Sequence, residues 1–149
     1  MNTFFNTATY QTFVQRIGQL SATSTPLWGK MTVGQMLYHL NLALGCSIGK
    51  HALADESNFL SRSIVKWSVL YVLPRFLTNL PTGKTITVLA PKVFEEEQIS
   101  LLNTLAQMQQ QTEAGVNGMH PLFGKLNGKE WGVLAYKHLD HHLRQFSRR

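Results

Sequence analysis

The sequence predicts an all-α fold: a four-helix bundle with a long irregular crossover between the second and third main helices. Three observations predict it. Four separate stretches place apolar residues three and four positions apart. Two of these stretches open with a capping box, which marks the start of a helix. The chain has 149 residues, 44% hydrophobic and 15% charged, which suits one sizeable core, so we expect residues 1–149 to form a single domain.

The first two helices are separated by residues 21–26, which break the apolar pattern. The stripe of the first is Tyr10, Phe13, Val14, Ile17 and Leu20. The second opens with Thr32, and Gln35 follows three residues later, so each side chain can satisfy a free backbone donor of the first turn. Its stripe is Val33, Met36, Leu37, Leu40, Ala43 and Leu44. Gly49 is its expected stop.

The crossover that follows is apolar without a clear period. Residues 58–80 are expected to hold one or two short helices, interrupted at Pro74. Residues 85–89 (TITVL) have the composition of a short strand. Because a lone strand has no pairing partner, we expect this segment to lie extended across the helices instead.

The third helix follows Pro91, and three glutamates at positions 95–97 crowd its start, where negative charge meets the positive end of the helix dipole. Its buried side is Phe94, Leu101, Leu102, Leu105 and Met108. Residues 114–118 (AGVNG) are expected to form a loop. The fourth helix begins near Asn127, with Glu130 at the reciprocal capping position, and runs to about Phe146.

Composition and charge narrow the class of protein. The formal charge of +6 favours anionic ligands, but it is no nucleic-acid signature, and the arginines at 144, 148 and 149 lack interleaved aromatics or a reading motif. The single cysteine, Cys46, cannot form an internal disulfide. The first ten residues lack a signal-peptide pattern, and the apolar run at 67–74 is far shorter than a membrane span. We therefore expect a cytoplasmic protein with no membrane or nucleic-acid partner.

The fourth helix carries the strongest chemical signal. His138 and His142 lie within roughly 20° of the direction of Trp131, on the face that the helix should bury. Spacing of i, i+4 lets two imidazoles converge on one ion, and a divalent metal would satisfy their buried nitrogens. His141 lies roughly 80° off that direction and is a poorer ligand, which could instead orient a neighbour or hydrogen-bond between helices. Two structural histidines remain the alternative.

A third ligand must come from another helix, and His39 is the best candidate. It lies on the flank of the second helix's stripe, which suits a ligand reaching into a cleft and equally a half-exposed structural histidine. Cys46 lies about 10 Å further along the axis, so it cannot share the ion and is expected to be a small buried side chain. His51 is expected at the surface. His120 is expected to dock its loop or to border the pocket.

Several segments together resemble a known family. They are LWGKMTVGQMLYH at 27–39, HPLFGKL at 120–126, EW at 130–131, and YKHLDHHLRQF at 136–146. The chain resembles the DinB-like superfamily of small metal-binding helical bundles, and within it a subgroup catalogued as a domain of unknown function. The segments cover about half of the chain, and residues 51–92 match only loosely.

The resemblance implies a divalent metal, zinc, nickel or iron, held by His39, His138 and His142, with His141 not a ligand. It further implies a metal-dependent transferase that uses a low-molecular-weight thiol. A metal-dependent hydrolase and a non-catalytic metal-binding stress-response module are the alternatives.

Three neutral imidazoles leave an ion with its full charge and an open position, as in catalytic sites. That position suits water or a thiol, since a bound cation favours deprotonation of either. No carboxylate is an obvious general base, because Asp140 points outward and Glu130 is used in capping. An anionic thiol such as glutathione would suit the positive charge, with Lys137 or Arg144 as rim contacts. The expected partner is a small-molecule substrate, and a homodimer is plausible.

Overall fold

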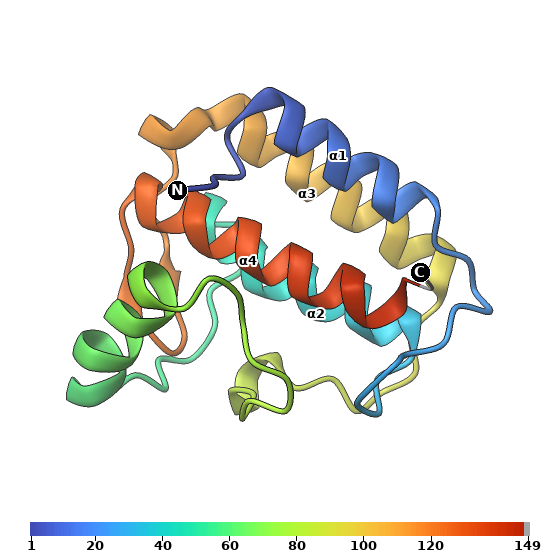
Figure 1. Cartoon of the computed structure of the whole chain (residues 1–149), viewed down its shortest axis with the longest axis horizontal. Helices are drawn as coiled ribbons and strands as arrows, with labels where there is room; N and C mark the ends of the chain where they lie inside the picture. Colours follow the sequence, from blue (N-terminus) through green and yellow to red (C-terminus); the bar gives the residue numbers. More distant parts are fainter. Residues whose placement is uncertain (148–149) are drawn as a thin grey trace.

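A computed structural model describes residues 1–147 and confirms the predicted helical bundle (Figure 1). Its four α-helices are α1 (Thr7–Gly18), α2 (Val33–Gly45), α3 (Phe94–Gly115) and α4 (Gly128–Phe146). All four coincide with the predicted stretches, apart from the end of α3. Of the predicted basic tail, Arg148 and Arg149 lie outside the described residues.

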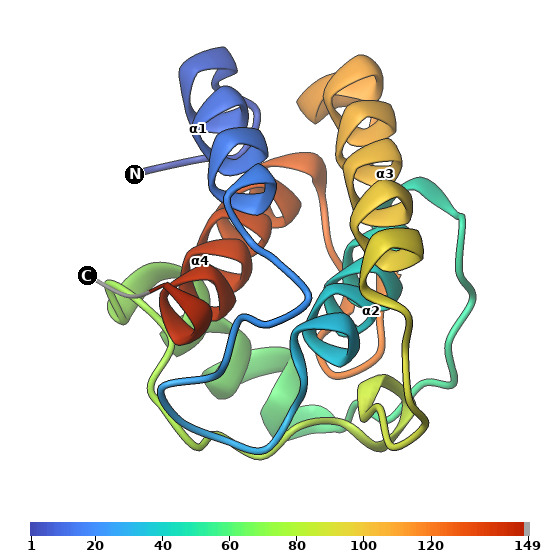
Figure 2. The same cartoon turned by 90° about the vertical axis from the view of Figure 1, so that its right-hand side faces the viewer.

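The helices form two layers, with α1 and α3 in one and α2 and α4 in the other (Figure 2). The core between them receives buried side chains from every helix, such as Phe13, Leu37, Leu105 and Leu139. The loop between α1 and α2 and the long crossover both run along the outer face of the α2 and α4 layer. The loop and the crossover therefore cover the outer face of α2 and α4, and the candidate site lies between them and these helices.

The helix ends follow the local signals in the sequence. Thr32 and Gln35 make both hydrogen bonds of a capping box at the start of α2, and Asn127 and Glu130 do the same for α4. After Gly45 the chain continues as the 3-10 turn η1 (Cys46–Ile48) and ends in Gly49, whose φ of 71° is favourable for glycine. These caps determine where α2 and α4 begin, and so where their histidines lie along the helix axes.

The end of α3 differs from the prediction. The helical segment extends to Gly115, into the predicted loop, and is interrupted at Thr112, where φ is 60° and ψ is 177°. A small antiparallel hairpin follows, β1 (Met119–His120) paired with β2 (Gly124–Lys125), which was not predicted. Strands of two residues are too short to show an alternating pattern in a sequence.

The crossover contains short helical turns, as predicted. Two lie in the predicted range, the π-helical turns η2 (Ser61–Val65) and η3 (Ser68–Val72), which end before Pro74. The 3-10 turn η4 (Lys84–Ile86) was not predicted. Within residues 85–89 there is no strand, and Thr87 is extended. The crossover is held against the bundle by Lys137 of α4, whose buried ammonium donates to the carbonyls of Val69, Leu70 and Leu73 at 2.6–2.8 Å.

Across residues 1–147, no helix combines the length and apolar character needed to cross a membrane.

Candidate metal centre

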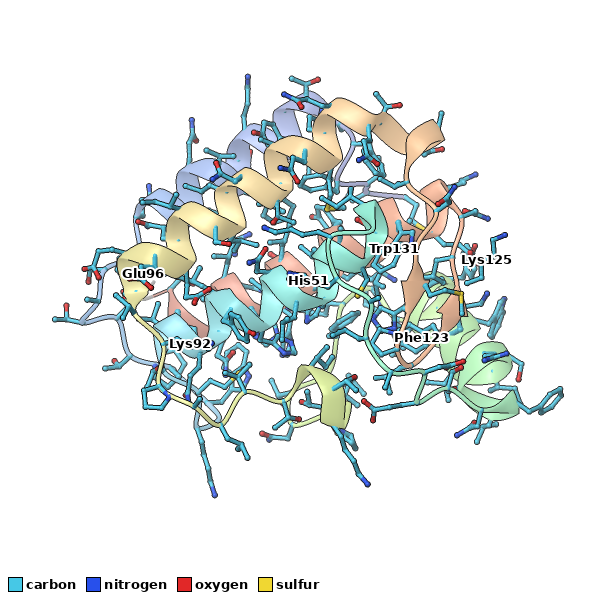
Figure 3. All side chains as sticks on the ribbon, turned by 180° about the vertical axis from the view of Figure 1, so that it is seen from behind. His51, Lys92, Glu96, Phe123, Lys125 and Trp131 are labelled. Carbon is cyan, nitrogen blue, oxygen red and sulfur yellow. The ribbon has the colours of Figure 1, made fainter. Side chains whose placement is uncertain are left out.

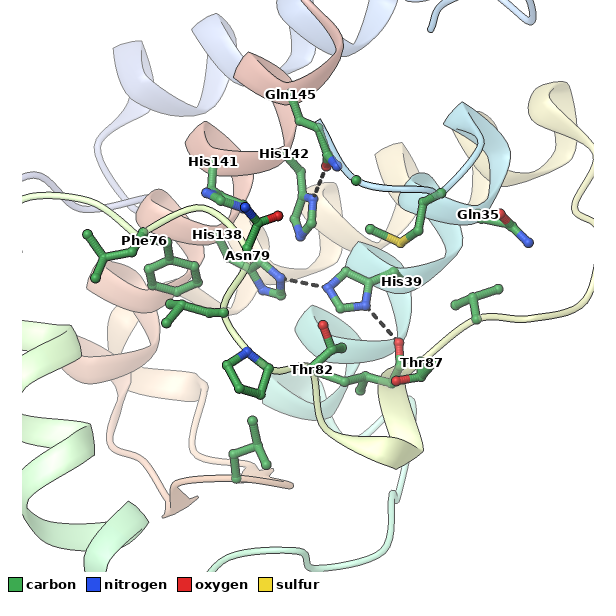
Figure 4. Close-up of a pocket in the computed structure, with 18 of the residues that line it drawn as sticks. Gln35, His39, Phe76, Asn79, Thr82, Thr87, His138, His141, His142 and Gln145 are labelled. Atoms are coloured by element: carbon green, nitrogen blue, oxygen red, sulfur yellow. Dashed lines mark hydrogen bonds between the residues drawn. The ribbon is translucent and has the colours of Figure 1, made fainter. Parts of the chain in front are cut away.

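The structure brings together the three histidines selected from the sequence. His39 projects from α2, and His138 and His142 project from successive turns of α4 (Figure 4). The three ring centroids are 4.8–5.0 Å apart, and one nitrogen of each ring lies within 4.8 Å of the others. All three side chains are buried, so the half-exposed alternative for His39 is wrong. This arrangement has the donors and the spacing to hold one metal ion.

A backbone carbonyl orients the His39 ring. Nδ1 of His39 lies 2.7 Å from the carbonyl oxygen of Ile86 in η4. Because a carbonyl only accepts, Nδ1 carries the proton and Nε2 presents its lone pair to the centre. The carboxylate of Glu56 accepts hydrogen bonds from the backbone amides of Lys84 and Thr85. Glu56 thereby holds the turn that supplies this carbonyl, so the crossover determines the tautomer of His39.

A glutamine orients the His142 ring in the same way. Nδ1 of His142 lies 2.9 Å from Oε1 of Gln145, and the amide nitrogen of Gln145 donates to the carbonyl of Trp28 at 2.7 Å. Since that donation commits the amide nitrogen, the oxygen of Gln145 faces His142, and Nδ1 of His142 must carry the proton. Nε2 of His142 is left free as a ligand. Outer contacts of this kind are typical of metal-binding histidines.

The closest contact in the cluster is between two ring nitrogens. Nε2 of His39 and Nε2 of His138 lie 2.9 Å apart (Figure 4). The proton of His39 is already on Nδ1, so its Nε2 faces His138 as a lone pair. Without a metal, Nε2–H of His138 therefore donates to Nε2 of His39, and a cation between the two nitrogens would take the place of this proton. The donor set therefore fits a cation: three neutral imidazoles whose outer nitrogens are engaged in two of the three rings.

Burial keeps these imidazoles neutral. Desolvation lowers the pKa of His39, against the opposing effect of its hydrogen bond to Ile86. Burial lowers the pKa of His138 and of His142 well below the usual histidine range, and electrostatic repulsion between the protonated rings of each and of His39 would lower both further. A neutral ring is the form that binds a metal, so no deprotonation is needed near neutral pH.

A cavity of about 500 Å³ opens beside the three rings. Its apolar wall comes mainly from the crossover and includes Phe76, Leu77, Leu80, Val88 and Leu89. Among the described residues that line it, Lys30 is the one charged side chain, and none is a carboxylate. The histidines thus face a chamber large enough for a small organic molecule.

The family of the chain follows from comparison with known proteins. A family model described as "Protein of unknown function (DUF1569)" matches residues 5–149. The chain belongs to this family. No curated protein and no solved structure matches the chain at a significant level. The predicted membership of a domain family of unknown function is thereby confirmed.

Two further histidines of this DUF1569 protein line the cavity. The ring centroid of His141 lies 5.0 Å from that of His142 and 5.9 Å from that of Phe76. Its buried Nδ1 has no hydrogen-bond partner within residues 1–147. Burial, and then the charge of Arg144, lower the pKa of His141. His120 both docks its loop and borders the cavity, so the two predicted roles occur together.

The remaining predictions for single residues gave mixed results. Cys46 is buried, as expected, and it is not among the described cavity-lining residues. His51 was expected at the surface, but it is half-buried against Gly45 of α2, with its Nε2 fully covered (Figure 3). A Cβ at position 45 would lie 2.4 Å from the His51 ring, so the glycine makes room for it.

The predicted rim contacts of the DUF1569 chain are wrong. Lys137 is buried under the crossover, and Arg144 pairs with Asp140 at 2.9 Å; neither lines the cavity. Lys30, in the loop before α2, takes that place. Asp140 points away from the site and also pairs with Arg16, as its helical phase predicted.

Sequence reasoning missed Gln145, the partner of His142. Its position three residues after His142, on the same face of α4, was a usable signal.

Proposed function

We propose that this DUF1569 protein is a DinB-like metalloenzyme, in which His39, His138 and His142 hold one zinc, nickel or iron ion. The reaction we propose is transfer of a low-molecular-weight thiol to an electrophilic substrate. The observation that carries the proposal is the juxtaposition of three neutral imidazoles, two of them oriented by outer hydrogen bonds, with a cavity. A purely structural metal needs closed coordination and no adjoining chamber.

When bound, the ion would supply Lewis acidity that stabilises the thiolate form of the thiol. The thiol proton passes to solvent, the sulfur forms a bond to an electrophilic carbon, and the leaving group departs with the electrons of the broken bond. The chain itself orients the ligands through Ile86 and Gln145 and excludes water with the apolar wall. Lys30 and the net charge of +6 favour an anionic thiol such as glutathione.

Hydrolysis is less well supported than thiol transfer, because no carboxylate among the described residues lines the cavity to act as a general base. The thiol reaction needs no such base when a cation already favours the thiolate.

The test is elemental analysis of tag-free protein, for the wild type, His138→Ala and the matched control His51→Ala. We expect about one ion per chain in the wild type and control, and none in His138→Ala. A panel of thiols is then assayed against an aryl halide, with release of halide as the readout. Wild-type protein without bound metal overturns the metal site. Metal-loaded protein that is inactive with every thiol overturns the transferase reaction and leaves the site.

A further inference from the structure

The orientation of His120 in β1 is determined by the backbone of its own hairpin. Nδ1 of His120 accepts hydrogen bonds from the backbone amides of Leu122 at 3.1 Å and Phe123 at 3.3 Å. A nitrogen that accepts two N–H groups carries no proton, so the neutral ring has its proton on Nε2. His120 is therefore a hydrogen-bond donor at the end of the ring opposite the loop.

Aromatic neighbours hold the plane of this ring. His120 stacks on Phe123 with ring centroids 4.7 Å apart and an interplanar angle of 14°, and it tilts against Trp131 at 5.7 Å. The side chain is 4% exposed and lines the same cavity as the three candidate ligands. Trp131 is itself fixed, since its indole N–H donates to the carbonyl of Gly118.

The Nε2–H group has no acceptor within residues 1–147. In that part of the chain, three fully covered side-chain atoms lack a partner, and they belong to His51, Gln109 and His141. Nε2 of His120 is not one of them, so this atom is not fully covered, and the ring lines the cavity. A donor that is held in one direction, and left without a protein acceptor, is suited to a ligand.

The wall of the cavity limits which ligand can meet this donor. Its apolar side chains come mainly from the crossover, and others come from the loop before α2, from the hairpin and from Leu134 of α4. A few polar side chains, such as Asn79 and Thr82, also line it, and its volume of about 500 Å³ exceeds that of a chain of eight carbons. Polar groups of a ligand that lay against Phe76, Leu77 or Leu80 would be buried there without partners, which is costly. A ligand with one polar head can place that head at the histidines and its apolar part against this wall.

We propose that His120 is a ligand-binding residue of this cavity, and that the cavity takes a small, mainly apolar molecule with a single oxygen-bearing head, such as a carbonyl or carboxylate, that accepts a hydrogen bond from Nε2 of His120. This inference names the class of the electrophilic substrate of the proposed metal site, as distinct from the thiol, and rests on that site for its reaction. The binding contact itself comes from the hairpin and the cavity wall.

Two variants separate the two ends of the ring. In His120→Asn, the amide oxygen can take the place of Nδ1 and keep the loop docked, while the donor toward the cavity is lost. In His120→Gln, the longer side chain can place an amide N–H near the position of Nε2. His51→Asn is the matched control, because His51 does not line the cavity.

The experiment is isothermal titration of zinc-loaded protein with octanoate and with acetate, which has the same head without the tail. We expect octanoate to bind about a hundred-fold more tightly than acetate. His120→Asn should weaken octanoate binding about ten-fold with unchanged zinc content and melting temperature, and His120→Gln should restore it to within about three-fold. The His51→Asn control should bind octanoate as the wild type does.

Three results would overturn the inference. Unchanged octanoate affinity in His120→Asn would show that His120 does not donate to the ligand. Equal losses of octanoate affinity in His120→Asn and His120→Gln would show that the residue serves loop docking alone. Equal affinities for octanoate and acetate overturn the ligand class. If the wild type takes up no zinc, the proposed function fails separately. The same titrations are then made on metal-free protein. Weaker octanoate binding in His120→Asn than in the wild type supports the inference, and equal binding overturns it.

Discussion

Replacement of Gln145 by methionine should weaken zinc binding although residue 145 is not a ligand. Methionine keeps the length and burial of the side chain but offers no strong acceptor to Nδ1 of His142. The zinc-bound state requires the lone pair on Nε2 of His142, and hence the proton on Nδ1. In Gln145→Met this N–H would be buried without its partner at 2.9 Å.

The expected size of the effect follows from that lost contact. A buried donor left without a partner costs about 1–3 kcal/mol. If this cost falls on the metal-bound state, the dissociation constant for zinc rises by about 5- to 150-fold. Substitution of outer partners of metal ligands typically has an effect of about 10- to 100-fold, which lies within this range.

The assay is competition for zinc against a chromophoric chelator of known affinity. Gln109→Met on α3 is the matched control, because its amide donates to the carbonyl of Phe5, remote from the cavity. We expect an unchanged zinc affinity in Gln109→Met and about a ten-fold loss or more in Gln145→Met. If Gln145→Met retained zinc within about three-fold of the wild type, the argument that Gln145 selects the tautomer of His142 would be refuted.

Three other outcomes are expected. In metal-free protein the buried histidines have pKa values below the unfolded value of 6.5, so the unfolded chain takes up more protons as pH falls, and the free energy of unfolding decreases below about pH 6.5. Burial lowers the pKa of His120 to about 3, and this residue alone should lower the free energy of unfolding by about 2 kcal/mol between pH 6.5 and 5. Equal urea midpoints at pH 7 and 5 would contradict this. Lys137→Met leaves three crossover carbonyls without their donor and should lower the free energy of unfolding by about 2–4 kcal/mol, with faster proteolysis at Lys66. A decrease below about 0.5 kcal/mol in urea unfolding would show that these contacts contribute little. Thr32→Ala removes one half of the α2 capping box and should lower the free energy of unfolding by about 1 kcal/mol, against no change in exposed Thr25→Ala.

The helices could be predicted because their signals are local. The capping pairs Thr32 with Gln35 and Asn127 with Glu130 act within one turn, and apolar periodicity gives the buried face of each helix without knowledge of its neighbours. The same reasoning placed His138 and His142 on one face of α4. Distant contacts play no part in these features, so one sequence was sufficient to predict them.

The crossover could not be predicted in the same way, because distant residues hold it. The turn η3 is held by the ammonium of Lys137, and η4 is held by the carboxylate of Glu56, 28 residues earlier in the chain than Lys84. Lys137 was therefore predicted at the cavity rim. Helical phase alone could not show that the crossover covers the side of α4 that carries Lys137.

By itself, the sequence determined four helices, their ends except that of α3, and the faces that carry three candidate ligands. The tertiary structure alone decided that α2 approaches α4 so closely that two ring nitrogens lie 2.9 Å apart. It also decided which nitrogen of His39, His120 and His142 carries a proton, and which wall encloses the cavity. The physical reason is range: helix periodicity depends on neighbours within a turn, whereas tautomers and cavities depend on partners that only the folded chain brings into contact.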